Sequence, residues 1–400
     1  METMEKVVYL DNAATTACAP EVLAVMTQAL SGACGNPSSH YSVGYEAKEF
    51  VDTGRAQVAK AINASPAEIF FTGCGSEADN WAVKGTAFTK ARQNKKHLIT
   101  SAFEHHAIMH SMAALERMGF EVTYIKPTPE GYIRPEDVEA AIRPDTALVS
   151  IMMANNEIGT IQPIEAIGAL CRERGIPFHT DAVQAVGHVP VDVQAMHIDL
   201  LSCSAHKFHG PRGVGFLYAR RGIPLTNIIE GGAQERGKRG GTENTPAIAG
   251  MAAALREAVD HMAENTEKVT RLRETLIAGL STIEHARLNG DREQRVPGTV
   301  NFCFEGIEGE SLLLLLDRKG IAASSGSACT SGSLDPSHVL LAIGLPHEVA
   351  HGSLRLSVGE YNTDEEMAYI VDNVRQVVAY LRSISPVWDE LETGARPHLI

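Results

Sequence analysis

Short apolar runs alternate with amphipathic segments through the first two thirds of the chain. Residues 97–100 and 147–153 have the length of strands, and the second run is apolar enough to be buried on both faces of a sheet. Residues 47–62 instead place apolar side chains at helical spacing. The alternation of these two patterns over about residues 50–260 predicts an α/β domain with a mostly parallel sheet.

The last third of the chain has a different pattern. Residues 248–280 have the apolar spacing of long helices, which would bridge into a second domain. Beyond them, residues 298–304 and 351–358 predict strands, and the leucine-rich residues 311–316 predict a buried helix. The tail near residues 397–398 shows no pattern of order. A second, smaller domain is therefore expected after the α/β domain.

Composition narrows the class of protein. The 400 residues are 44% hydrophobic and 21% charged, which is ordinary for a globular chain, and the formal net charge is −14. That charge argues against binding to nucleic acid or to an anionic membrane surface, and no apolar run approaches the roughly 20 residues that span a bilayer. The seven cysteines are scattered without zinc-ligand spacing, so we expect a cytoplasmic protein with no metal site and no disulfide framework.

A lysine after an apolar run is the first candidate for chemistry. Lys207 follows residues 198–201 and precedes a Gly/Pro turn, and burial there would lower its pKa, so that the neutral amine could form a Schiff base. Asp181 ends another short apolar segment, where parallel sheets present functional residues. Pyridoxal phosphate requires this pair, because a lysine holds it and an acid faces its pyridine nitrogen. A solvated turn lysine and a helix N-cap aspartate are the plainer alternatives.

Two glycine-rich segments could bind a phosphate group. Gly75 and Ser76 lie in a turn between an apolar run and a helical pattern, where backbone N–H groups and a helix N-terminus would face an anion. Residues 231–244 form a basic, glycine-rich stretch that could reach a phosphate across a subunit boundary. An ordinary turn and a flexible surface loop explain these segments equally well.

Three further side chains suit binding or proton transfer. His105 could transfer protons at neutral pH or stack on a planar ring, although a lone histidine is more often structural. Asn156 could hydrogen-bond a ring oxygen or a carboxylate, or could serve only in a turn. Arg355 lies in a predicted strand, and its planar guanidinium suits a substrate carboxylate.

Cys329 lies in a run of serine, glycine and alanine over residues 321–333. Small residues favour a loop that can move, and an accessible cysteine on such a loop is a candidate nucleophile. An unreactive loop thiol is the alternative.

Six stretches together resemble the group I cysteine desulfurases of the class-V aminotransferase family, most closely the NifS type. They lie at residues 9–16, 103–105, 154–157, 179–187, 204–207 and 324–332. The resemblance implies the α/β fold type I of pyridoxal-phosphate enzymes, with a mostly parallel seven-stranded sheet flanked by helices and a smaller α+β domain. It implies a large domain over residues 16–262 and a small domain formed by residues 1–15 and 263–400, with the cysteine loop at about residues 322–334.

The same resemblance implies a homodimer that converts L-cysteine to alanine and a persulfide on Cys329. The sulfur would then pass to a NifU- or IscU-like iron–sulfur scaffold, with nitrogenase maturation as the expected pathway. Lys207 would hold the pyridoxal phosphate and shuttle protons, and His105 would stack on its ring and act in acid/base steps. The other implied contacts are Asp181 with the pyridine nitrogen; Gln184 with the ring hydroxyl; Gly75, Ser76, Ser204 and His206 with the phosphate; Thr242 of the other subunit with the same phosphate; Asn156 with cofactor and substrate; and Arg355 with the substrate carboxylate.

Some positions depart from the commonest family pattern. Cys74 and Cys203 flank expected phosphate contacts, and we interpret both as packing variants, while His106 adds a second imidazole after His105. An aminotransferase or a selenocysteine lyase would share the lysine and the aspartate without depending on Cys329. A catalytically silent scaffold or sulfur carrier on the same fold would bind no cofactor.

Overall fold

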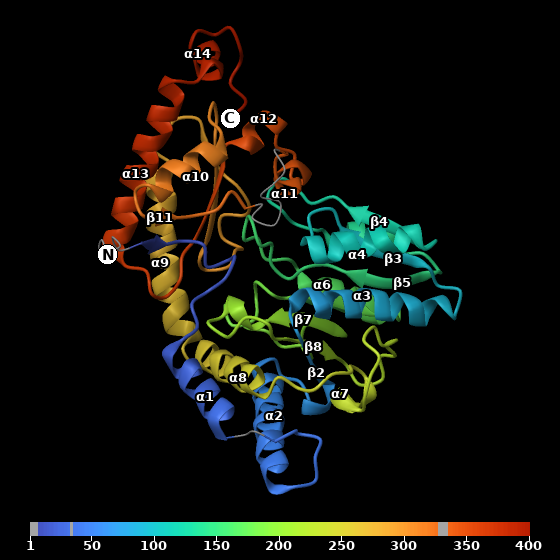
Figure 1. Cartoon of the computed structure of the whole chain (residues 1–400). Helices are drawn as coiled ribbons and strands as arrows, with labels where there is room; N and C mark the ends of the chain where they lie inside the picture. The colour runs from blue at the N-terminus through green and yellow to red at the C-terminus, as the bar shows by residue number, and fades with distance from the viewer. Residues whose placement is uncertain (1–6, 33–34, 327–334) are drawn as a thin grey trace.

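The computed structural model of the chain describes residues 7–32, 35–326 and 335–400, and its centre is a seven-stranded sheet (Figure 1). The strand order is β2-β8-β7-β6-β5-β3-β4, and only β8 runs antiparallel to its neighbours. The predicted mostly parallel seven-stranded sheet is therefore confirmed. Its strands are β2 (Ile69–Thr72), β3 (His97–Ser101), β4 (Glu121–Ile125), β5 (Thr146–Ser150), β6 (Phe178–Asp181), β7 (Leu200–Ser204) and β8 (Gly215–Ala219).

Helices cover the central sheet, as strands buried on both faces require. Every residue of β3, β5, β6 and β7 is buried, and α3 packs across β5, β6, β7 and β8. Figure 1 shows α3 and α4 over the sheet, and α1, α2 and α8 packed together below it. The helices of this part are α1 (Pro20–Gly32), α2 (Ser42–Ala61), α3 (Gly75–Ala91), α4 (His106–Arg117), α5 (Pro135–Ala141), α6 (Ile164–Glu173), α7 (Gln234–Gly237) and α8 (Thr245–Asp260), with the 3-10 turns η1 (Pro66–Glu68) and η2 (Ala205–Lys207).

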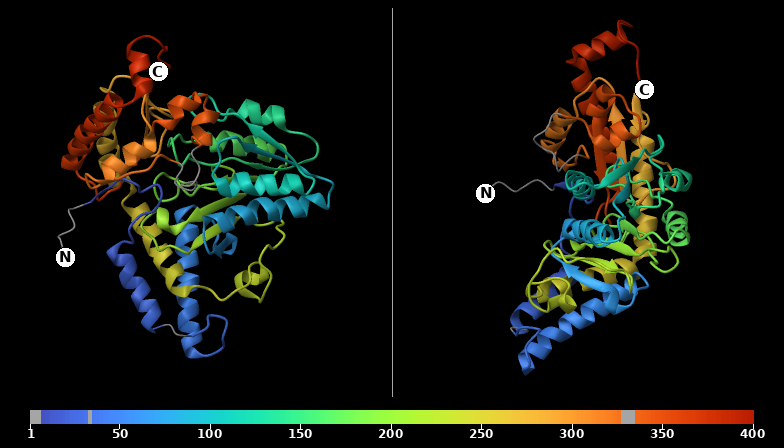
Figure 2. Two further views of the ribbon diagram at one scale, coloured as in Figure 1. Left: turned by 45° about the horizontal axis from the view of Figure 1, so that its top comes forward. Right: turned by 90° about the vertical axis from the view of Figure 1, so that its right-hand side faces the viewer.

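The C-terminal elements gather beside the central sheet around a second, three-stranded antiparallel sheet of order β12-β10-β9 (Figure 2). The short strand β1 (Val8–Tyr9) joins this part by pairing in parallel with β11 (Ile321–Ala322). The remaining elements are α9 (Met262–Leu280), β9 (Ala286–Leu288), β10 (Thr299–Phe304), α10 (Gly309–Asp317), α11 (His338–Ala342), α12 (His347–His351), β12 (Ser353–Ser357), α13 (Asp364–Ser383) and α14 (Pro386–Glu392).

Two expectations for the C-terminal part were wrong. The leucine run forms α10, but the helix is not buried all round, because Leu312 and Leu316 are fully buried whereas Leu314 is 63% exposed. The tail is ordered, since the backbone N–H of Leu399 donates to a carboxylate oxygen of Glu305 at 2.7 Å. His398 lies 2.8 Å from the other oxygen of the same carboxylate. In the described parts of the chain, no helix combines the length and hydropathy that crossing a bilayer requires.

Candidate active site

Two neighbouring strands of the central sheet end at candidate residues. Strand β6 ends at Asp181, which is paired with Ser202 of β7, and the turn η2 that follows β7 carries Lys207. The Nζ atom of Lys207 donates to the backbone oxygens of Ala13 and Ala14 at 2.7 and 2.8 Å. The carboxyl edge of the sheet therefore brings the lysine and the aspartate together beneath the N-terminal segment.

Asp181 is a buried carboxylate with few compensating contacts. Burial raises its pKa to about 6, opposed by the N–H of Val183, which donates to Oδ1 at 2.9 Å, and by the charge of Lys207. A second buried carboxyl, that of Asp79 on α3, lies close by, and burial together with the Asp181 charge raises its pKa well above the usual value. Two neighbouring buried carboxyls resist simultaneous ionisation, so a cationic partner at Asp181 would be strongly favoured.

His105 forms the N-cap of α4. Its Nδ1 accepts the backbone N–H of Ala107 at 3.2 Å, which places the proton of the neutral ring on Nε2. Burial lowers the pKa of His105 to about 4, and the nearby charges of Lys207 and His106 act in the same direction. A ring atom of His105 lies within 4.8 Å of a carboxylate oxygen of Asp181, so both predicted residues face one site.

The N-terminus of α3 lies at the same edge of the sheet. The helix begins at Gly75, and its N-cap residue Cys74 makes no side-chain capping bond, so its first N–H groups are available to an anion. A Cβ atom at position 75 would lie 2.9 Å from Val183 Cγ2 and 3.3 Å from Ser204 Cβ, so only glycine fits this approach. Ser204 is buried and Ser76 is exposed.

The two extra cysteines differ from each other in the structure. Cys203 is fully buried in β7, as expected of a packing residue. Cys74 is exposed, so its interpretation as a packing variant was wrong. It follows Gly73 at the start of α3 rather than lying within a strand.

Two of the remaining predicted cofactor contacts, Gln184 and His206, contact the N-terminal segment, and Thr242 lies elsewhere. Gln184 Nε2 donates to the backbone oxygen of Ala13 at 2.9 Å, and His206 Nδ1 lies 3.1 Å from Thr15 Oγ1. Thr242 is exposed in the connection between α7 and α8.

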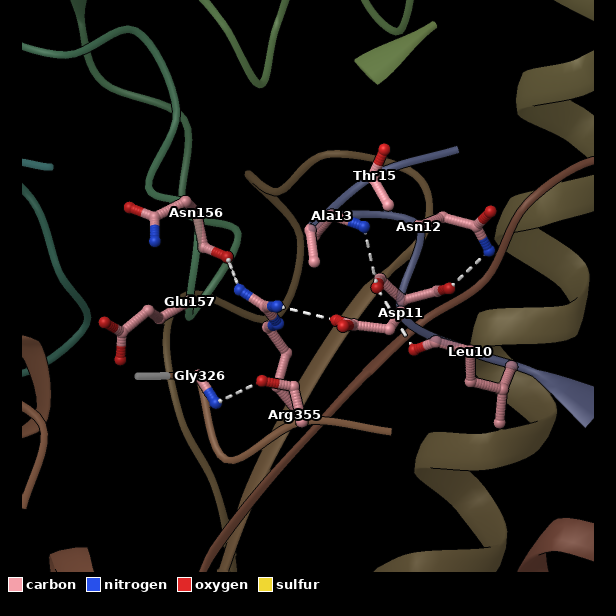
Figure 3. A network of polar contacts seen from close by, with 12 residues as sticks. Leu10, Asp11, Asn12, Ala13, Thr15, Asn156, Glu157, Gly326 and Arg355 are labelled. Atoms are coloured by element: carbon pink, nitrogen blue, oxygen red, sulfur yellow. Dashed lines mark hydrogen bonds and ion pairs between the residues drawn. The ribbon is translucent and has the colours of Figure 1, made fainter. Parts of the chain in front are cut away.

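Arg355 lies buried in β12, between Asn156 and Asp11 (Figure 3). Its Nη1 donates to the backbone oxygen of Asn156 at 2.8 Å, and its Nη2 donates to Asp11 Oδ1 at 2.7 Å. Among the described residues, Arg355 Nε and Asn156 Oδ1 are buried without a hydrogen-bond partner. These two polar atoms are suited to a ligand that offers both an acceptor and a donor, such as an amino acid.

Cys329 lies outside the described residues. The chain leading to it is tied to the arginine strand, because the backbone N–H of Arg355 donates to Ser324 O at 2.6 Å and Ser324 N donates back to Arg355 O at 3.2 Å. The backbone N–H of Gly326 then donates to Ser324 Oγ at 3.1 Å. On the other side, Ser337 Oγ donates to the buried carboxylate of Glu157 at 2.5 Å.

Comparison with known proteins agrees with this arrangement. A family model described as aminotransferase class-V matches residues 8–370. Over 390 residues the chain is 53% identical to the cysteine desulfurase IscS of Clostridium botulinum, which covers 97% of this chain and 98% of that relative. The chain belongs to the class-V aminotransferase family. A second relative, the cysteine desulfurase IscS of Methanosarcina thermophila, is 51% identical over 387 residues, which is 97% of this chain and 96% of that one.

Solved structures extend the comparison. A structure described as a NifS-like protein matches with a TM-score of 0.88 at 38% identity, covering 94% of this chain and 100% of that chain. A structure described as SspA in complex with cysteine matches with a TM-score of 0.79 at 38% identity, covering 89% and 99%. This chain is thus a class-V enzyme of the cysteine desulfurase type, and it uses pyridoxal phosphate.

Three acidic residues at this class-V site had no assigned role in the sequence, namely Asp11, Asp79 and Glu157. Asp11 lies in a polar turn that could be mere connection, and Asp79 lies in the helix after the glycine turn. Asp79 and Glu157 are both buried in the structure. A charged residue within a stretch that is expected to be buried is the signal that could have found them. No local pattern could have found the contact of Asp11 with a residue 344 positions away.

Proposed function

We propose that this site removes sulfur from L-cysteine, giving alanine and a persulfide on Cys329. The observation that carries the proposal is that Lys207, Asp181 and His105 lie together at one edge of the sheet. The charge of Lys207 acts there to lower the pKa of both other residues. The identity with relatives named cysteine desulfurase supports the choice of substrate.

The residues present fit pyridoxal phosphate. The uncapped N-terminus of α3 and the close approach at Gly75 suit the phosphate, with Ser76, Ser204 and His206 as further contacts. The buried Asp181 carboxylate suits a protonated ring nitrogen, and the Gln184 amide would contact the ring hydroxyl. When bound, the cofactor supplies an electron sink for the pair released at the Cα of the substrate.

The side chains around the cofactor divide the remaining work. Lys207 anchors the cofactor and then carries a proton to and from the substrate carbon. His105 is neutral at pH 7, because its pKa is about 4, and so it can exchange the proton on Nε2 without becoming a fixed cation. Arg355 would hold the substrate carboxylate through its unpartnered Nε, and Asn156 would hold it by donating from its amide Nδ2.

The sulfur transfer itself requires Cys329. The Cβ–S bond of cysteine breaks, a new bond joins that sulfur to Cys329 Sγ, and a proton completes the methyl group of alanine. Cys329 acts as the thiolate, because the thiolate is the nucleophilic form.

The decisive experiment compares two cysteine variants. Incubation of the purified protein with L-cysteine should yield alanine and, by mass spectrometry, one added sulfur atom on the peptide that contains Cys329. C329A should keep the yellow cofactor but lose sulfide release, whereas the control C18A, at a half-buried thiol with no assigned role, should retain both. Full turnover by C329A would exclude the persulfide role and favour an aminotransferase reaction.

The assembly state and the sulfur acceptor are part of the same proposal. Apolar side chains are exposed on α1 and near the start of α2, and a homodimer would bury them; they are Leu23, Leu30, Tyr41 and Tyr45. Thr242 would then contact the phosphate of the other subunit. The named relatives are IscS enzymes, so we propose delivery to an IscU-like iron–sulfur scaffold in the cytoplasm rather than a role restricted to nitrogenase.

We also propose the domain division made from the sequence, with a large domain over residues 16–262 and a small domain of residues 1–15 and 263–400. One buried apolar cluster supports it, because all its core members lie in the second set, from Val8 and Leu10 to Leu381.

A further inference from the structure

The ion pair between Asp11 and Arg355 joins distant parts of the chain inside the site. Asp11 lies between β1 and α1, and Arg355 lies in β12, yet Oδ1 and Nη2 are 2.7 Å apart. The arginine side chain is only 3% exposed and that of the aspartate is 21% exposed. A guanidinium at such depth requires a counter-charge, and Asp11 supplies it directly.

No other described acid takes this place on Arg355. Glu157 is the nearest alternative, since the Arg355 charge acts on its pKa, but its Oε2 accepts from Ser337 Oγ. In Figure 3 the Glu157 carboxylate points away from Arg355, whereas the Asp11 carboxylate points toward it. With Nη1 bound to Asn156 O, the guanidinium is held from two sides.

Asp11 is itself held rigidly to the arginine strand. Asn12 Nδ2 donates to Ser357 O at 2.8 Å, and the N–H of Ala13 donates to Ser357 Oγ at 2.9 Å. Because Ser357 is two residues from Arg355 in β12, the aspartate and the arginine keep a constant relative position. The oxygen of Ala13 also accepts from Lys207 Nζ, so the same segment contacts the cofactor lysine.

We propose that Asp11 is a positioning residue for substrate recognition. It holds the Arg355 guanidinium by one nitrogen and leaves the unpartnered Nε edge for the carboxylate of the amino-acid substrate. Asp11 touches neither substrate nor cofactor in this role and acts only through Arg355. The inference rests on the proposed function, in which Arg355 binds that carboxylate.

The test uses the holoenzyme and two substitutions at position 11. D11A removes the hydrogen bond to a charged group and should raise KM for L-cysteine about 10- to 100-fold, with kcat within about 3-fold of wild type. D11N keeps an acceptor oxygen at the same reach but not the counter-charge, so its KM should lie between those of wild type and D11A. The control D145A removes an exposed partner of Arg143 and should change neither constant.

A binding measurement separates recognition from turnover. Titration of the visible cofactor band with L-alanine, which carries a carboxylate, should show weaker binding to D11A by a similar factor. Titration with ethylamine, which lacks the carboxylate, should give the same affinity in D11A and wild type. If wild type makes no alanine from cysteine, the proposed function fails, but the two titrations still test Asp11.

A double-mutant cycle decides whether Asp11 acts through Arg355. In an R355A background, D11A should cause no further loss of L-alanine affinity, and D11A/R355A should fold even if D11A alone does not, because no unpaired buried charge remains. Additive losses, equal impairment of D11N and D11A, or an unchanged L-alanine affinity in folded D11A would each overturn the proposal.

Discussion

Protonation of His105 should account for a measurable part of the pH dependence of stability. The native ring has a pKa of about 4, whereas a histidine in the unfolded chain titrates near 6.5. Between these values only the unfolded state binds the proton, so stability is fully present above pH 6.5 and is lost as the pH falls toward 4. The difference corresponds to about 2 to 3 kcal/mol between pH 7.5 and pH 4.5.

The H105N substitution isolates this contribution. Asparagine keeps an acceptor for the backbone N–H of Ala107 and is a good N-cap, so α4 should begin normally. It also removes the titrating ring. Over the same pH range, the free energy of unfolding should therefore fall less in H105N than in wild type, and the two losses should differ by about 2 to 3 kcal/mol.

Urea denaturation followed by far-UV circular dichroism at pH 4.5, 5.5, 6.5 and 7.5 measures the effect. Other buried histidines, such as His179 with a pKa of about 3, titrate in both proteins and cancel in the difference. Parallel curves for H105N and wild type would refute the assignment of a depressed His105 pKa to its buried site.

Three further substitutions test a buried carboxyl, a close approach of two strands and a buried ion pair. Burial raises the pKa of Glu104 to about 8, so the stability that its protonated form contributes is lost as the pH rises from about 4.5 to 8. In calorimetry, the Tm of E104Q relative to wild type should therefore rise over that range. A constant difference in Tm would contradict this. G215A should cost at least about 2 kcal/mol in urea unfolding, because its Cβ would lie 2.4 Å from Cys203 O, and wild-type stability would show that the strands can separate. E235Q should cost about 3 kcal/mol by weakening the buried bidentate pair with Arg55, at 2.7 and 2.8 Å, and a loss below 1 kcal/mol would show that the pair adds little.

The pattern of hydrophobic and polar residues predicted the features that depend on residues close together in the sequence. Apolar runs of strand length became the buried strands β3 and β5, because a strand covered on both faces favours a nearly continuous run of apolar side chains. Parallel strands end at one edge, so the joint placement of Asp181 and Lys207 followed from their positions after such runs. The six motifs extended this to the family, which the comparisons confirmed.

The tertiary structure decided what depends on contacts across the chain. A leucine run is helical in either case, but only the packing of α10 shows that Leu314 faces outward. The order of the tail depends on Glu305, and the fixed geometry of Arg355 depends on Asp11. Hydrophobic periodicity reports local burial alone, whereas a pairing across 344 residues forms only after β1 and β12 have been brought together, so no local signal can encode it.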